Sequence, residues 1–225
     1  MKKRFFVTGT NTDAGKTYVT VGLLKAAQRA GARALGLKPV AAGAEWREGV
    51  LRNDDGLRIH AANSVKLPYE QVNPVVLEEA IAPHIAASHE GRLVTASRLQ
   101  GYIQGALLTP HDFALVEGAG GWRVPLNDRE LLSDVAKSLH FPVILVVDMR
   151  LGCLNHAILT AEAIVADGLT IAGWIANSGQ DRMPCFEENV ATLSSLFLAP
   201  LLGVLPWSQD EKEAESVFDA LYSTL

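Results

Sequence analysis

A glycine-rich stretch near the N-terminus has the residues and spacing of a phosphate-binding loop. It reads Val7-Thr8-Gly9-Thr10-Asn11-Thr12-Asp13-Ala14-Gly15-Lys16-Thr17. In such loops, backbone N–H groups and the positive end of the following helix bind phosphate oxygens. Lys16 would reach the β- and γ-phosphates, and the Thr17 hydroxyl would bind Mg²⁺. Gly9 and Gly15 enclose five residues instead of the usual four, which indicates a variant loop that binds a nucleoside triphosphate.

A loop of this kind needs a nearby carboxylate to hold the metal ion or its water shell. Two apolar stretches end in an acid, at Glu117 and at Asp148. Glu117 is followed by glycine and alanine, whose bare backbone lets a bulky ligand approach closely. Asp148 could instead pair with Arg150, so we favour Glu117. Asp55 is a third candidate, although taken alone it is explained as an acid at a helix start.

Lys38 lies at the end of an apolar run, within Leu37-Lys38-Pro39-Val40. An unpaired ammonium is costly to bury, and a nearby anion would relieve that cost. The alternative is a lysine whose ammonium reaches solvent at a strand end. The sequence alone leaves both interpretations open.

Other polar residues give weaker signals. Residues 151–155 offer a glycine and free N–H groups before a helix, where a carboxylate could bind, although, taken alone, a plain helix start explains them better. Cys153 and Cys185 have no neighbouring base, so we do not expect a thiol nucleophile, and two cysteines exclude a disulfide framework. The six histidines show no metal-binding spacing and are interpreted as surface or structural residues.

These residues must be positioned by strands and helices that alternate along the chain. Continuous apolar runs predict buried strands at residues 5–8, 34–40, 113–117, 143–148, 171–177 and 201–205. Helices are predicted at residues 16–30, 96–108, 131–139, 155–166 and 185–197, with an acidic amphipathic helix at 210–225. This order predicts an α/β fold, a parallel sheet flanked by helices, with ligands at the carboxyl ends of the strands. Residues 44–83 break the pattern and predict an irregular stretch with one short helix near 55–62.

Length and composition limit the possible functions. The 225 residues, 48% of them hydrophobic, predict one globular domain over residues 1–225. Twenty basic residues against 25 acidic ones leave no positive surplus for nucleic acid or an anionic membrane. No apolar run approaches the ~20 residues that span a bilayer, and the N-terminal apolar run is too short for a secretory signal. We therefore expect a cytoplasmic protein.

Beyond these motifs, the chain resembles the dethiobiotin synthetase family over nearly its whole length. The stretches that carry the resemblance are FFVTGTNTDAGKT, GLKPVAAG, EGVLRNDD, APHIAASHEG, LVEGAGGW, FPVILVV, LGCLNHA, GWIAN and APLLGVLPW. The resemblance implies a variant P-loop fold, a homodimer, and ATP and Mg²⁺ as cofactors. It also implies a reaction in which CO₂ joins the two amines of 7,8-diaminononanoate in a cyclic urea while ATP becomes ADP and phosphate. A carbamate and a carbamic–phosphoric anhydride are the implied intermediates.

The resemblance also assigns roles to individual residues. Lys38 is the implied catalytic lysine, assisted by Lys16, and the implied magnesium ligands are Thr17, Asp55 and Glu117. The implied nucleotide contacts are Asp13, Ala14, Gly15, Lys16, Thr17, Tyr18, Asp55, Glu117, Gly118, Ala119, Gly120, Asn177, Ser178, Pro206, Trp207, Ser208 and Glu213. The implied substrate contacts are Ala42 and, from the partner subunit, Gly152, Cys153, Leu154 and Asn155.

Three residues depart from the pattern of the family. Ala42 stands where members carry a serine that touches the substrate, Asn11 where an acid is common, and Asp148 where a small residue is common. The main alternative is a partition or positioning ATPase of the same superfamily that acts as a nucleotide switch. Such proteins usually carry a lysine early in the loop, whereas Thr8-Gly9-Thr10 stands here. A nucleotide-binding protein without catalysis is a third possibility.

Overall fold

The computed structural model describes residues 2–180, 182–207 and 211–225. Its centre is a six-stranded parallel sheet with strand order β10-β9-β8-β1-β7-β2. The strands are β1 (Lys3–Gly9), β2 (Ala34–Leu37), β7 (Phe113–Glu117), β8 (Val143–Asp148), β9 (Ile171–Asn177) and β10 (Leu201–Leu205). Each overlaps a predicted apolar run, which confirms the α/β fold class.

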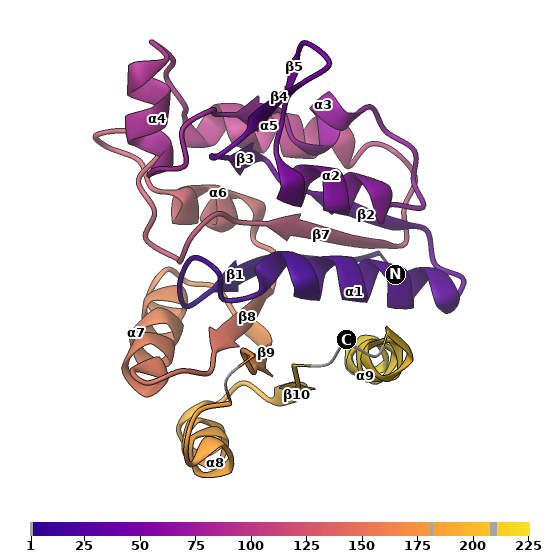
Figure 1. Ribbon diagram of the computed structural model, residues 1–225, viewed down its shortest axis with the longest axis vertical. Coiled ribbons are helices and arrows are strands. Elements are labelled where there is room, and N and C mark those ends of the chain that lie inside the picture. The colour runs from indigo at the N-terminus through magenta and orange to yellow at the C-terminus, as the bar shows by residue number, and fades with distance from the viewer. Residues whose placement is uncertain (1, 181, 208–210) are drawn as a thin grey trace.

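Helices cover both faces of the sheet (Figure 1). One face packs against α1 (Lys16–Arg29), α9 (Glu211–Thr224) and part of α2 (Asp54–Ala61). The other packs against α5 (Ala96–Ala106), α6 (Leu132–Leu139), α7 (Cys153–Ala166) and α8 (Phe186–Leu196). Successive β1 residues alternate between the two cores, as the period of a strand requires: Phe5 and Val7 face α1, and Phe6 faces the opposite layer. Arg29 pairs with Asp219 at 2.7 Å and joins α1 to α9.

The predicted strand at 34–40 is wrong in its second half. β2 ends at Leu37, and the chain then leaves the sheet through Lys38 and Pro39. Residues Val40–Ala41 form β3, which pairs with β6 (Val75–Val76) in a separate small sheet. Pro39 has no N–H for a ladder bond, and the Lys38 N–H donates to Val72 O at 2.8 Å instead. The exit from the sheet places Lys38 at its carboxyl edge.

The prediction of a largely irregular segment over residues 44–83 is also wrong. A hairpin of β4 (Glu45–Arg47) and β5 (Val50–Arg52) precedes the expected helix, α2. α3 (Tyr69–Val72), β6 and α4 (Pro83–His89) follow. These elements are too short for a hydrophobic period to reveal them, and side-chain hydrogen bonds hold them; Asn53, for example, caps α2 by accepting from Gly56 N–H at 3.2 Å.

Both cysteines are free thiols, Cys153 buried and Cys185 exposed. Over the described residues, no helix combines the length and apolar character needed to span a membrane.

Candidate active site

A cavity of about 820 Å³ opens at the carboxyl ends of β1 and β7, which are neighbours in the sheet. The loop between β1 and α1 forms one wall, and the loop after β7 forms another. α2 and the segment before α4 close the remaining sides. The predicted site residues on its surface are Asp13, Gly15, Lys16, Thr17, Tyr18, Lys38, Ala42, Asp55, Ala119 and Gly120. Ala14 and Glu117 are buried beneath this surface.

The phosphate-binding loop is held in a sharply curved conformation. Gly15 has φ +90° and sits directly before α1, in the left-handed region that glycine adopts without strain. A Cβ at this position would collide with the side-chain amide of Asn177. That amide donates from Nδ2 to Ala14 O at 3.0 Å and ties the loop to the end of β9. Lys16 Nζ donates to Asn11 O at 2.9 Å, so its ammonium folds over the loop where phosphate oxygens would bind.

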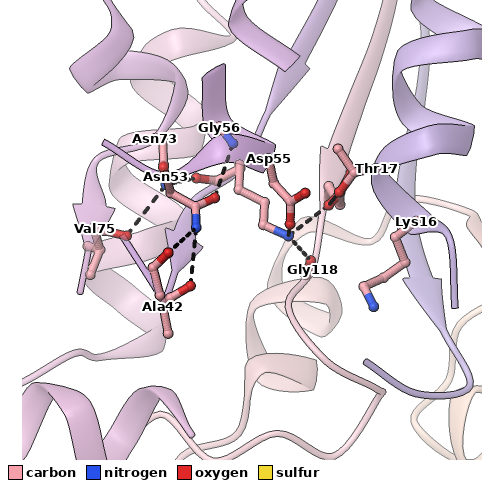
Figure 2. A network of polar contacts seen from close by, with 12 residues as sticks. Lys16, Thr17, Ala42, Asn53, Asp55, Gly56, Asn73, Val75 and Gly118 are labelled. Carbon is pink, nitrogen blue, oxygen red and sulfur yellow. Dashed lines mark hydrogen bonds and ion pairs between the residues drawn. The ribbon is translucent and has the colours of Figure 1, made fainter. Parts of the chain in front are cut away.

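Glu117 is the centre of a buried polar cluster. Its Oε1 accepts from Thr17 Oγ1 at 2.7 Å and from Lys38 Nζ at 2.7 Å. Lys38 Nζ also donates to Gly118 O at 2.9 Å and lies 3.6 Å from an Asp55 carboxylate oxygen. Glu117, Asp55 and Gly118 thus surround the Lys38 ammonium, and Thr17 joins this network through Glu117. Lys16 lies apart from the network (Figure 2). Lys38 is therefore a buried, paired cation and not a lysine that reaches solvent.

A chain of buried hydrogen bonds connects the Lys38 backbone with α2. Asn73 donates from Nδ2 to Lys38 O at 2.7 Å and accepts from Tyr69 Oη at 2.8 Å. Tyr69 Oη accepts in turn from Asn53 N–H at 2.9 Å. Asn53 Nδ2 donates to Ala42 O at 3.1 Å, so the same network reaches the cavity wall (Figure 2). The backbone of Lys38 and the start of α2 are thus fixed relative to each other.

The two lysines of the cavity have different electrostatic environments. Burial favours the neutral amine of Lys38, but Glu117 and Asp55 outweigh it and raise the pKa above the usual lysine value. Burial and the positive charge of Lys38 lower the pKa of Lys16 to about 8. Lys38 therefore stays charged at neutral pH, whereas Lys16 begins to lose its proton in mildly alkaline solution.

The oxygen atoms of Thr17, Glu117 and Asp55 are suited to a hard cation such as Mg²⁺. Glu117 Oε2 is fully buried and has no hydrogen-bond partner within the described structure, which leaves one carboxylate oxygen available for a ligand. Asp148 is a poorer candidate, because its carboxylate pairs with Arg150 at 2.7 Å. In the described ranges, no three His, Cys, Asp or Glu side chains gather to hold a metal alone. Mg²⁺ at this place would need further oxygens, such as those of a triphosphate.

Several predicted nucleotide contacts do not line the cavity. Asn177 contacts the loop from behind, and Ser178, Pro206 and Trp207 follow the ends of β9 and β10. The Trp207 side chain is 58% exposed. Burial is the larger cause that raises the pKa of Tyr18, and the nearby negative charge of Glu213 raises it further. Ser208 lies outside the described residues.

The predicted substrate loop, Gly152 to Asn155, also lies away from the cavity of its own chain. It forms the start of α7 at the end of β8, with Gly152 as the N-terminal cap. Cys153 is buried there, with its Sγ 4.0 Å from Met183 Sδ. Ala42, by contrast, lines the cavity.

The sequence prediction missed two arginines and one segment of the cavity wall. Arg58, one turn after Asp55 on α2, and Arg123, in the loop after β7, both line the cavity. Arg123 donates to Asp167 at 2.7 and 3.1 Å, and Asp167 also accepts from Trp122 Nε1 at 2.8 Å. Residues Ala80 to Pro83 complete the wall. The helical spacing of Arg58 from Asp55 was a usable signal, whereas nothing local to residues 80–83 indicated the cavity.

Comparison with known proteins identifies close relatives over the whole site. A family model described as an AAA domain matches residues 3–215. The ATP-dependent dethiobiotin synthetase BioD of Cellvibrio japonicus is 57% identical over 91% of this chain and 90% of its own length. That of Marinobacter nauticus is 51% identical over 95% and 92% of the two chains. The BioD of Alteromonas mediterranea is 46% identical over 97% of this chain and 98% of its own length.

Solved structures with a similar fold are more distant in sequence. The septum site-determining protein MinD of Pyrococcus horikoshii, in complex with Mg-ADP, has a TM-score of 0.62 at 17% identity, covering 99% of this chain and 95% of MinD. A putative plasmid partition protein of Borrelia burgdorferi bound to AMPPNP has a TM-score of 0.61 at 10% identity, covering 100% of this chain and 98% of the partition protein. At such identities the likeness shows a shared P-loop fold alone. The level and extent of identity with the synthetases confirm the predicted resemblance: this chain belongs to the ATP-dependent dethiobiotin synthetase family of enzymes.

Proposed function

We propose that the protein closes the ureido ring of dethiobiotin from 7,8-diaminononanoate, CO₂ and ATP. The supporting observation is that Lys16 and Lys38 line one cavity next to a phosphate-binding loop. A phosphoryl group between the two ammonium groups would face a positive charge from either side. The family relationship supports the identity of the diamine, and the cavity of about 820 Å³ has room for both it and a triphosphate tail.

In the proposed reaction, one amine adds to CO₂ and loses a proton, which gives a carbamate. A carbamate oxygen then attacks the γ-phosphorus, the bond to the β-phosphate oxygen breaks, and ADP leaves. The second amine attacks the carbonyl carbon of the resulting anhydride, phosphate leaves with the electron pair of the C–O bond, and the amine loses a proton. The product is the cyclic urea, with ADP and phosphate.

The main obstacle to this chemistry is repulsion between an anionic nucleophile and an anionic phosphoryl group. Lys38 is charged, buried and fixed by Glu117 and Gly118, so it can offset this charge without reorganisation. Lys16 contributes from the loop side, above the phosphates. In the proposed complex both ammonium groups attract the transferring oxygens, and their effect grows as charge develops in the transition state.

Thr17, Glu117 and Asp55 would hold Mg²⁺ together with the triphosphate. The unpartnered Glu117 Oε2 supports this assignment. When bound there, Mg²⁺ would neutralise part of the phosphate charge. Equilibrium binding of Mg²⁺ and ATP to Glu117→Gln tests the assignment: we expect the Mg²⁺ dependence of ATP binding to weaken.

A second copy of the chain would complete the substrate site. The Gly152–Asn155 loop does not reach the cavity of its own chain, and the adjacent apolar side chains Leu151, Leu159 and Val165 are largely exposed. Such an apolar surface supports an interface between two copies. Mixing inactive Lys38→Ala and Asn155→Ala proteins should restore part of the activity, because a mixed dimer contains one intact site. Sedimentation of the unmodified protein should give twice the chain mass, and a monomer would contradict the dimer.

The central test of the proposal is product formation by the purified protein. With diaminononanoate, bicarbonate, ATP and Mg²⁺, we expect ADP, phosphate and dethiobiotin in equal amounts. Omission of either the diamine or bicarbonate should abolish the cyclic product. ATP hydrolysis that does not depend on the diamine, without a cyclic product, would instead favour a nucleotide switch.

A further inference from the structure

Arg58 is placed to reach into the cavity from α2. It lies three residues after Asp55, which puts both side chains on one face of the helix. Helical side chains lean towards the N-terminus of their helix, and the N-terminus of α2 faces the cavity. This lean directs the Arg58 side chain towards the turn that carries Asp55, and Arg58 lines the cavity.

The carboxylates nearest to Arg58 along α2 are already paired with other cations. Asp54 pairs with Arg47 at 2.6 Å, and Asp55 lies 3.6 Å from Lys38 Nζ. Among the described residues, no hydrogen bond or ion pair engages the Arg58 guanidinium. The other arginine of the cavity, Arg123, is different, because Asp167 holds it through two hydrogen bonds. Arg58 thus keeps its donors available for a ligand.

The position of Arg58 indicates which ligand group it meets. Thr17 and Asp55, with Glu117 buried beneath the surface, mark the end of the cavity where the terminal phosphates would lie. Arg58 is the next residue on the Asp55 face of α2. A guanidinium presents its donors as a planar fork that matches phosphate oxygens, and it keeps its charge over the whole physiological range. Arg58 would therefore add a permanent charge beside two lysines.

We propose that Arg58 binds the terminal phosphoryl group of the nucleotide and distinguishes a triphosphate from a diphosphate. This inference rests on the proposed function only for the nucleotide, not for the diamine. In the reaction, Arg58 would hold the γ-phosphoryl oxygens on the side facing α2, while Lys16 and Lys38 act from the loop and the sheet. Release of ADP would then be favoured once the phosphoryl group has been transferred.

Equilibrium binding of the non-hydrolysable analogue β,γ-imido-ATP and of ADP, both with Mg²⁺, tests this proposal. Arg58→Ala should weaken binding of the imido analogue by about 10- to 100-fold and change ADP affinity by less than about twofold, as expected for loss of a charged hydrogen bond to one phosphate. Arg58→Lys should give an intermediate loss, because a lysine keeps the charge without the fork.

Arg98→Ala is the matched control, because Arg98 is an exposed helical arginine on α5 outside the cavity. It should leave both affinities unchanged. Equal weakening of both nucleotides by Arg58→Ala, or no weakening, would overturn the proposal. If Arg58→Ala weakens neither nucleotide, a separate binding measurement with diaminononanoate would show whether Arg58 contacts the substrate instead. The nucleotide-binding assay needs neither diamine nor bicarbonate. Its result therefore does not depend on whether the protein forms the cyclic product.

Discussion

The two ends of the predicted nucleotide site are built in different ways. At the phosphate end, Lys16, Thr17 and Glu117 are buried, and hydrogen bonds fix their positions. At the base end, Trp207 is mostly exposed, and Asn177 uses part of its amide to hold the loop. A rigid charged end provides affinity through groups that every nucleoside triphosphate shares, whereas an open end discriminates weakly between bases. We therefore expect the phosphate end to dominate binding and catalysis.

Replacement of the buried lysine at the phosphate end should have the largest effect. Lys38→Ala is expected to lower kcat by about 10²–10³-fold, because the transition state loses a preorganised positive charge. The change also leaves the buried Glu117 carboxylate without its cation, which typically costs about 3–5 kcal/mol of stability. Steady-state rates must therefore be measured well below the unfolding temperature of the variant.

Lys38→Arg separates the two effects of this substitution. It keeps a cation beside Glu117, so part of the lost free energy of unfolding should be restored. The larger guanidinium cannot take the same place, so kcat should remain low. A folded Lys38→Ala variant with a nearly unchanged kcat would contradict the catalytic role.

Gly15→Ala tests the link between the loop and the base end. At φ +90° an alanine is strained, and its Cβ would also collide with the Asn177 amide. Gly31→Ala is the matched control, with φ +81° and nothing within 4 Å of a new Cβ, so it should cost only about 1 kcal/mol. We expect Gly15→Ala to be less stable than the control in thermal unfolding and to bind ATP more than about tenfold more weakly. Equal effects of the two substitutions would show that the contact with Asn177 is unimportant.

Titration of Lys16 should make nucleotide affinity depend on pH. Phosphate favours the charged ammonium, and the pKa of Lys16 in the free protein is about 8. Below that pH the lysine is already protonated and affinity should be constant; above it, affinity should fall by up to about tenfold per pH unit, because binding must restore the proton. Calorimetry from about pH 7 to about pH 9, a range that brackets this pKa, would measure the slope. Lys16→Arg should flatten the curve, and an unchanged slope in this variant would assign the titration to another group.

The smallest effect is expected at the base end. Trp207→Ala removes an exposed aromatic surface that is not part of the cavity lining, so we expect the KM for ATP to rise by only about threefold, with kcat unchanged. The ratio of kcat/KM for ATP to that for CTP should change little. A large selective loss for ATP would mean that the base end closes on the nucleotide, and it would reverse the comparison between the two ends.

Much of the fold could be predicted from the sequence, because the strands of a parallel sheet are buried on both faces. Runs such as residues 113–117 and 143–148 therefore stand out as continuous apolar stretches. The phosphate-binding loop was also predictable, since Gly9, Gly15, Lys16 and Thr17 lie close together in the sequence.

The remaining parts depend on contacts between distant residues. The meeting of Lys38, Asp55 and Glu117 follows from where β2 and β7 end and α2 begins, which no local pattern encodes. The bend after Leu37 required both Pro39 and an acceptor at Val72, far along the chain. Arg58 was overlooked because a single arginine on a short helix is ordinary in sequence; its neighbours give it significance.

The hydrogen-bond chain through Asn53, Tyr69 and Asn73 has a consequence for how the protein tolerates mutation. The buried Tyr69 hydroxyl connects Asn53, at the start of α2, with the Asn73 amide that is hydrogen-bonded to the Lys38 backbone. The position of the Lys38 ammonium relative to Asp55 therefore depends on this buried network. Damage to Tyr69, which touches no reacting atom, should therefore resemble damage to the lysine itself. The buried residues that position Lys38 should therefore tolerate substitution as poorly as the residues that contact the nucleotide.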